Sequence, residues 1–164
     1  MGFIEAVKTV LGKYATFSGR ARRAEFWWFF LFVVIAEMIT ALIDSLLWTP
    51  VIDPTTNVMT QPQWITGLFS LLVLLPTLAV AARRLHDINR SGWWQFLGYA
   101  AALAAVALMA LIAASAGWAV TPAIVWPMAL PFIAWVVLLV WYCKRGDVGA
   151  NRFGPDPINS IAYA

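Results

Sequence analysis

Four long apolar runs constrain this chain more than any other feature of its sequence. A bilayer core of about 30 Å needs ~20 apolar residues in a helix that rises about 1.5 Å per residue. Runs of that length lie at about residues 26–48, 65–82, 93–118 and 123–142. Because only residues 119–122 separate the last two runs, we expect a tight hairpin there, broken at Gly117 and Pro122. The runs predict an all-α integral membrane protein whose four transmembrane helices form a bundle.

Composition supports this prediction and limits the chemistry. Of the 164 residues, 62% are hydrophobic and 12% are charged, which is far from the balance of a soluble domain. The length and the lack of a linker favour a single membrane domain over residues 1–164. Since Cys143 is the only cysteine, an intrachain disulfide and a four-thiolate zinc site are excluded. We expect neither a metal nor a cofactor.

The distribution of positive charge predicts the orientation. All eleven Lys and Arg residues lie before residue 26, in the loop at 83–92, or in the tail at 143–164. Cytoplasmic loops keep the excess of Lys and Arg, so we expect both termini in the cytoplasm. A cleaved signal is disfavoured because the first run is too long and carries two acids. Nucleic acid is excluded as a partner because the apolar runs leave no soluble face for a duplex.

The segment before the first run is a candidate amphipathic helix at residues 1–16. Its apolar side chains recur at helical spacing, at Phe3, Ile4, Val7, Val10, Leu11 and Tyr14. One interpretation places this helix in the inner-leaflet interface, with its lysines near anionic lipid. The other has it pack beneath the helix bundle. The sequence does not separate the two.

Three motifs carry most of the polar residues. They are FSGRARRAEFWW from Phe17, RRLHDINRSGWW from Arg83 and CKRGDVGANRFGPDP from Cys143. In this order they resemble the domain of unknown function 805 family of small bacterial inner-membrane proteins. The resemblance implies an inner-membrane location and supplies no activity and no catalytic residues.

If the helices form a bundle, the three motifs meet in one polar layer on the cytoplasmic side. We expect Asp87 to pair with Arg83 at helical i, i+4 spacing, and Arg20 or Arg23 to pair with Asp87 or Asp156. In one interpretation these charges neutralise one another and lock the loops to the helices. In the other, surplus guanidinium groups bind a phosphate of a lipid headgroup or of a soluble ligand. The candidate binding residues are Arg20, Arg23, Arg83, Arg84, His86, Asp87, Arg90, Asn151 and Arg152.

Two acids fall inside the first run. Glu37 is near its middle and Asp44 near its outer end, on one helix face. An ionised acid at the bilayer centre is disfavoured by about 2.5–3.5 kcal/mol, so we expect Glu37 to be protonated or hydrogen-bonded, with Ser70 among its candidate partners. Both acids are either stations for a proton or cation, or structural hydrogen-bonding groups.

These observations favour a non-enzymatic protein that binds anionic lipid or a partner protein through the polar layer, with homo-oligomers also open. The alternative is a small oligomeric transporter or channel for protons or cations, which uses Glu37 and Asp44. A membrane enzyme that acts on phosphorylated headgroups with His86 and Asp87 ranks last, because no nucleophile or metal-ligand set accompanies them. We therefore expect no catalytic residues.

Overall fold

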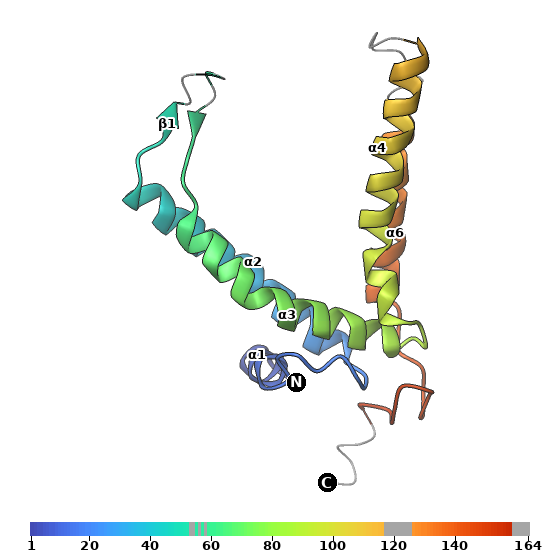
Figure 1. Cartoon of the computed structure of the whole chain (residues 1–164). Helices are drawn as coiled ribbons and strands as arrows, with labels where there is room; N and C mark the ends of the chain where they lie inside the picture. Colours follow the sequence, from blue (N-terminus) through green and yellow to red (C-terminus); the bar gives the residue numbers. More distant parts are fainter. Residues whose placement is uncertain (53–54, 56, 58, 117–125, 159–164) are drawn as a thin grey trace. The chain divides into compact units, whose positions relative to one another are not determined.

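The computed structural model describes residues 1–52, 55, 57, 59–116 and 126–158. The described part is mostly helical (Figure 1). Its α-helices are α1 Phe3–Gly12, α2 Arg23–Leu47, α3 Trp64–His86, α4 Leu97–Ala116 and α6 Ala129–Cys143. Two 3-10 helices, η1 Gly92–Phe96 and η2 Trp126–Met128, lead into α4 and α6. Strands β1 Val51–Ile52 and β2 Met59–Thr60 form a two-stranded antiparallel sheet.

Four helical segments are long and apolar enough to cross a membrane, as the four runs predicted. They cover Arg23–Leu47, Trp64–His86, Gly92–Ser115 and Trp126–Cys143. The largest difference from the sequence is the end of the second span, which we placed at about residue 82. The helix continues to His86, because Arg83 and Arg84 are only 1% and 0% exposed and contribute to packing. The predicted hairpin turn at Gly117 and Pro122 lies outside the described residues.

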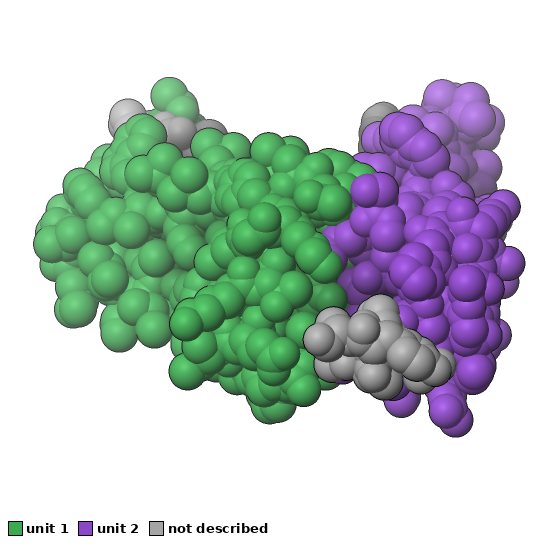
Figure 2. Space-filling view, turned by 90° about the horizontal axis from the view of Figure 1, so that it is seen from below, with its two compact units in different colours: residues 1–17, 24–80 green, residues 18–23, 81–164 purple. Residues whose placement is uncertain are grey.

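The chain divides into two compact units, which Figure 2 colours separately. Unit 1 comprises residues 1–17 and 24–80, and unit 2 comprises residues 18–23 and 81–164. Each unit holds one pair of long helices. The single domain and the four-helix bundle stay predictions.

In unit 1, α2 and α3 run antiparallel and side by side (Figure 1). The rings of Phe32 on α2 and Phe69 on α3 meet edge to face, with centroids 6.4 Å apart. The sheet of β1 and β2 joins the two helices, with Val51 opposite Thr60. This sheet corrects the all-α prediction, because strands of two residues are too short to show a period of two in the sequence.

Helix α1 packs within unit 1 and also keeps apolar side chains exposed. Phe3 contacts the ring of Trp28 on α2 edge to face, and Val10 is fully buried. Ile4, in contrast, is 67% exposed. The segment after α1 also contacts α3, where the Tyr14 hydroxyl donates to the carbonyl of Leu72. That carbonyl lacks its helical donor because the residue four positions later is Pro76, which has no N–H.

In unit 2, α4 and α6 lie side by side (Figure 1), and Gly98 marks a close approach between them. A Cβ at Gly98 would lie 2.6 Å from the indole ring of Trp135 on α6, so a larger residue would force the helices apart. The turn before α4 follows the predicted chemistry. Asn89 has a φ of 57°, and the Ser91 hydroxyl accepts from the backbone N–H of Trp93.

Candidate functional site

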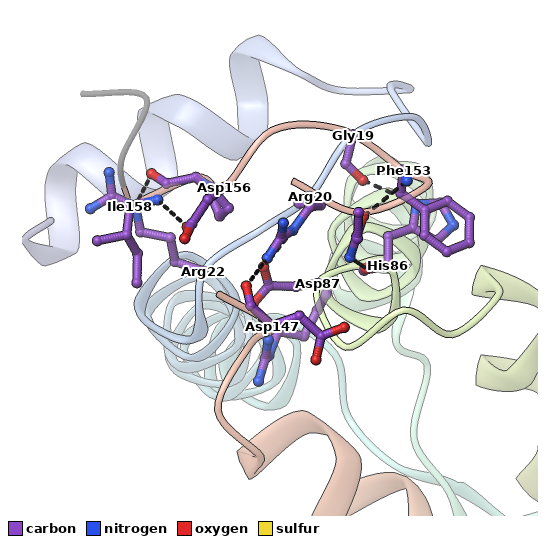
Figure 3. Close-up of polar contacts among 12 residues, drawn as sticks. Gly19, Arg20, Arg22, His86, Asp87, Asp147, Phe153, Asp156 and Ile158 are labelled. Atoms are coloured by element: carbon purple, nitrogen blue, oxygen red, sulfur yellow. Dashed lines mark hydrogen bonds and ion pairs between the residues drawn. The ribbon is translucent and has the colours of Figure 1, made fainter. Parts of the chain in front are cut away.

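Unit 2 brings parts of all three motifs together. Residues 18–23, the end of α3 with its following turn, and the tail at 144–158 meet in a cluster that we call the polar layer (Figure 3). Its members come from distant parts of the sequence. Arg20 and Asp87, for example, are 67 residues apart and form a hydrogen bond. The prediction that the three motifs meet is confirmed for these residues.

Asp87 is the centre of the polar layer. Its carboxylate accepts from Arg20 Nε at 2.9 Å and from Arg84 Nη1 at 2.6 Å. Burial raises the pKa of the Asp87 carboxyl, while the hydrogen bond from Arg20 and the charges of both arginines lower it. The predicted pair with Arg20 is confirmed. On α3 the described partner of Asp87 is Arg84, three residues earlier. The expected pair of Arg83 with Asp87 stays a prediction.

The two arginines also hold the tail against α3. Arg20 donates to the carbonyls of Asp147 and Gly149, and Arg84 donates to those of Tyr142 and Lys144. The backbone N–H of Asp147 donates to the carbonyl of Asp87 at 2.8 Å. Buried guanidinium groups are stable only when their donors find acceptors. Here backbone carbonyls accept from guanidinium N–H groups that do not donate to the Asp87 carboxylate.

The tail packs against Asp87 at Gly146. A Cβ there would lie 2.0 Å from Asp87 Oδ2, closer than any real contact. Glycine is therefore required because there is no room for a side chain at this position, and not because of the backbone conformation. The Gly146 position explains how the chain passes directly over a buried carboxylate.

His86 takes a structural place in the polar layer. Its Nδ1 lies 3.0 Å from the carbonyl of Gly19, and its ring stacks on Phe153 with centroids 3.9 Å apart. Because a carbonyl only accepts, Nδ1 carries the proton. Asn151 Nδ2 donates to the His86 carbonyl at 2.9 Å. These contacts tie α3 to both neighbouring segments (Figure 3).

Two further candidate arginines, Arg90 and Arg152, also make contacts inside unit 2. Arg90 lies over the ring of Trp141 at 4.0 Å. Arg152 donates to the carbonyl of Asn89 at 3.1 Å and lies over Phe153. Most of the predicted phosphate-binding residues are therefore engaged in holding the fold.

A cavity of about 240 Å³ opens beside these contacts. The basic residues that line it are not the arginines that bind Asp87. Its lining residues are Arg22, Arg23, Asp87, Arg145, Gly146, Pro157 and Ile158. Arg23 and Asp87 were predicted site residues, whereas Arg22 and Arg145 were missed. Their positions inside the motifs were the main signal, because Arg145 has no acid at helical spacing and the acid three residues after Arg22, Glu25, did not indicate a cavity. A second cavity of about 110 Å³ shares Asp87, Arg145, Gly146 and Ile158 and adds Asp147, Val148 and Asp156.

The two acids of α2 lie in unit 1 and differ in their partners. Glu37 Oε1 accepts from the Ser70 hydroxyl at 3.2 Å, which confirms Ser70 as a partner. Asp44 is 1% exposed, and its two oxygens accept from the backbone N–H groups of Ile65 and Thr66 at 3.1 and 2.9 Å. Asp44 therefore caps the start of α3. Among the described residues, no three His, Cys, Asp or Glu side chains are grouped to hold a metal ion.

Comparisons with known proteins agree with these observations. The family described as "Protein of unknown function (DUF805)" matches residues 14–155. Inner membrane protein YhaH of Escherichia coli is 36% identical over 149 residues, which cover 90% of this chain and 92% of the relative. Inner membrane protein YhaI of the same organism is 34% identical, covering 91% of this chain and 92% of the relative. No solved structure matches the chain.

Proposed function

Because the chain belongs to the DUF805 family, we propose that it is a non-enzymatic protein that binds anionic lipid at the cytoplasmic face of the membrane. The chain is an integral, multi-pass protein of the inner membrane, as its four apolar helices and its E. coli relatives indicate. Both termini are proposed to lie in the cytoplasm, because no Lys or Arg occurs between residues 26 and 82 or between 91 and 143.

One observation carries the lipid-binding proposal. Asp87 is already paired with Arg20 and Arg84, so its charge does not neutralise the arginines that line the larger cavity. Those arginines, Arg22, Arg23 and Arg145, give the cavity an excess of positive charge. Guanidinium groups bind phosphate oxygens through paired N–H donors, and anionic phosphates are abundant at the cytoplasmic leaflet.

Helix α1 supports the same location. It exposes Ile4 and Leu11, while Lys8 is also exposed. A helix with apolar and basic side chains accessible together suits the interface of an anionic leaflet. We propose that α1 lies in this interface and packs on α2 through Phe3.

Lipid selectivity tests the binding proposal. The protein would be placed in nanodiscs that contain equal amounts of phosphatidylglycerol and phosphatidylcholine, and its retained lipids identified by native mass spectrometry. We expect phosphatidylglycerol to be enriched and the enrichment to fall as salt is raised. Equal retention of the two lipids would contradict the proposal. Retention of a copurifying protein without anionic lipid would favour a protein partner instead.

The orientation is tested with the native cysteine. Cys143 is exposed at the end of α6, so a membrane-impermeant maleimide should label it in inverted vesicles and not in intact spheroplasts. A Cys143→Ser, Thr49→Cys variant moves the thiol to the other end of the spans, and it should show the opposite pattern. Labelling of Cys143 in intact spheroplasts would reject the proposed orientation.

A transporter or channel is the second candidate function, and the contacts of the two acids weigh against it. Asp44 uses both oxygens to cap α3, and Glu37 accepts a hydrogen bond from the Ser70 hydroxyl. Proton flux into proteoliposomes that disappears in Glu37→Gln would restore the transporter. Flux that is absent, or unchanged in Glu37→Gln, agrees with the lipid-binding role.

A further inference from the structure

We infer that the larger cavity of unit 2 is a site for a single phosphoryl group, held by Arg22, Arg23 and Arg145. This inference rests on the proposed lipid-binding function and assigns it to particular residues. The cavity of about 240 Å³ is smaller than the ~300–1,000 Å³ of sites for drug-sized ligands. A small anion or a headgroup fits such a volume better than a nucleotide or a peptide.

The three arginines differ in how far the fold already uses them. Arg22 donates from Nε to the carbonyl of Pro157 at 2.9 Å, which fixes the side chain beside the cavity. Arg23 makes one long contact of 3.5 Å to the carbonyl of Cys143. Arg145 is exposed, and the structure describes no hydrogen bond or ion pair for it within the described residues. The guanidinium fork of Arg145 is therefore the donor most available to a ligand.

The acid that lines the larger cavity is already paired with other arginines. It is Asp87, whose carboxylate is held by Arg20 at 2.9 Å and by Arg84 at 2.6 Å. The two guanidinium groups outweigh the single charge of Asp87, while the charge of Asp156 acts on Asp87 from the side of the smaller cavity. An anion that enters the cavity thus meets three further guanidinium groups and no unpaired carboxylate from Asp87.

The smaller cavity limits the ligand to one phosphoryl group. It shares Asp87, Arg145, Gly146 and Ile158 with the larger cavity, so the two are neighbouring lobes of one hollow. Its other polar residues are the acids Asp147 and Asp156. A second phosphoryl group in that lobe would lie next to like charges, which is unfavourable. A diphosphate should therefore bind less tightly than a monophosphate.

The shared chemistry has two sources, a phospholipid headgroup and a soluble phosphate. Calorimetry on the purified protein in nonionic detergent would use inorganic phosphate and inorganic diphosphate as probes. Native mass spectrometry from the nanodiscs would report retained phosphatidylglycerol, with and without millimolar phosphate. If phosphate displaces the lipid, the ligand is a headgroup. If phosphate binds at the same arginines and retention of the lipid does not change, the ligand is soluble.

Arg145→Gln is the central variant, because it removes one cavity charge without removing any described contact. Lys144→Gln is its matched control, since Lys144 is the exposed neighbour and does not line either cavity. We expect phosphate affinity to fall about tenfold in Arg145→Gln, as for the loss of one charge-assisted hydrogen bond. Lys144→Gln should stay within about twofold of the parent protein. Arg145→Lys should lie between the two, because it keeps the charge and loses the fork.

Several outcomes would overturn the inference. They are equal losses in Arg145→Gln and Lys144→Gln, diphosphate bound at least as tightly as phosphate, or no phosphate binding at millimolar concentration. Selective retention of phosphatidylglycerol that is unchanged in Arg145→Gln would reject this cavity and keep the proposed function. Phosphate binding that depends on Arg145, without any selectivity for phosphatidylglycerol, would reject the proposed function and keep the cavity.

Discussion

Two regions of the molecule bury a carboxylate by different means. In unit 2, Asp87 is 4% exposed and is held by two guanidinium groups. In unit 1, Asp44 is 1% exposed and accepts from two backbone N–H groups at the start of α3. The first arrangement neutralises a full charge with full charges, and the second uses the partial charge of a helix N-terminus.

The comparison teaches that the two carboxylates have different consequences for the molecule. Asp87 holds together segments that are far apart in sequence, and its partners carry charge that must stay compensated. Asp44 joins the neighbouring helices α2 and α3 and involves no charged partner among its described contacts. We therefore expect removal of the Asp87 carboxylate to cost more than removal of the Asp44 carboxylate.

Asp87→Asn should have the largest effect on stability. The change leaves Arg20 and Arg84 buried without a counter-charge, so we expect a loss of about 3–5 kcal/mol in the free energy of unfolding. Denaturant unfolding in detergent, followed by circular dichroism, would measure it. The control is Asp147→Asn, an exposed acid of the same tail, with an expected change under about 0.5 kcal/mol. Similar small losses in both variants would contradict the central place of Asp87.

Gly146→Ala tests whether the tail must pass directly over Asp87. The new Cβ would overlap the carboxylate, and we expect a loss of about 1–3 kcal/mol, with Asp87 displaced from Arg20 or Arg84. Gly149→Ala is the comparison variant. It has open space but a φ of 81°, so it should lose about 1 kcal/mol from backbone strain alone. Unfolding that is unaffected by Gly146→Ala would show that the tail lies elsewhere.

Asp44→Ala sharpens the comparison from the other side. Loss of the cap at α3 should lower the free energy of unfolding by about 0.5–2 kcal/mol. Asp44→Asn keeps one oxygen acceptor and should lose less. If Asp44→Ala is as damaging as Asp87→Asn, the distinction between the two carboxylates fails.

Tyr14→Phe should have the smallest effect of the four. It removes the hydroxyl that donates to the Leu72 carbonyl, so we expect a loss of about 0.5–1.5 kcal/mol. Tyr99→Phe is the control, since the structure describes only ring contacts for Tyr99. In a Pro76→Ala background, Tyr14→Phe should lower the free energy of unfolding by less, because the alanine N–H can then donate to the Leu72 carbonyl.

The sequence predicted the features that depend on long or repeated patterns. Run length was enough for the four spans, and charge type was enough to include the pair of Arg20 with Asp87 among a few candidate pairs. Ser70 was one of several candidate partners of Glu37, because few polar residues lie at that depth. Each of these predictions needed only the local chemistry of the residues involved.

Other features depend on how distant segments fold together, and the sequence did not show them. The ion pair of Arg84 with Asp87 depends on the direction in which the last turn of α3 faces the tail. The roles of Arg22 and Arg145 depend on the cavity, which forms only when the tail passes over Asp87 at Gly146. The sheet of β1 and β2 is too short to leave a periodic pattern.

Charge reversal at one cavity residue tests the central claim most directly. The ratio of phosphatidylglycerol to phosphatidylcholine retained from mixed nanodiscs would be compared in Arg145→Glu and Lys144→Glu. The two variants change the net charge equally, and only the first places an acid in the cavity. We predict that Arg145→Glu abolishes the enrichment of phosphatidylglycerol while Lys144→Glu keeps most of it. Equal enrichment in the two variants would contradict an anion site in this cavity.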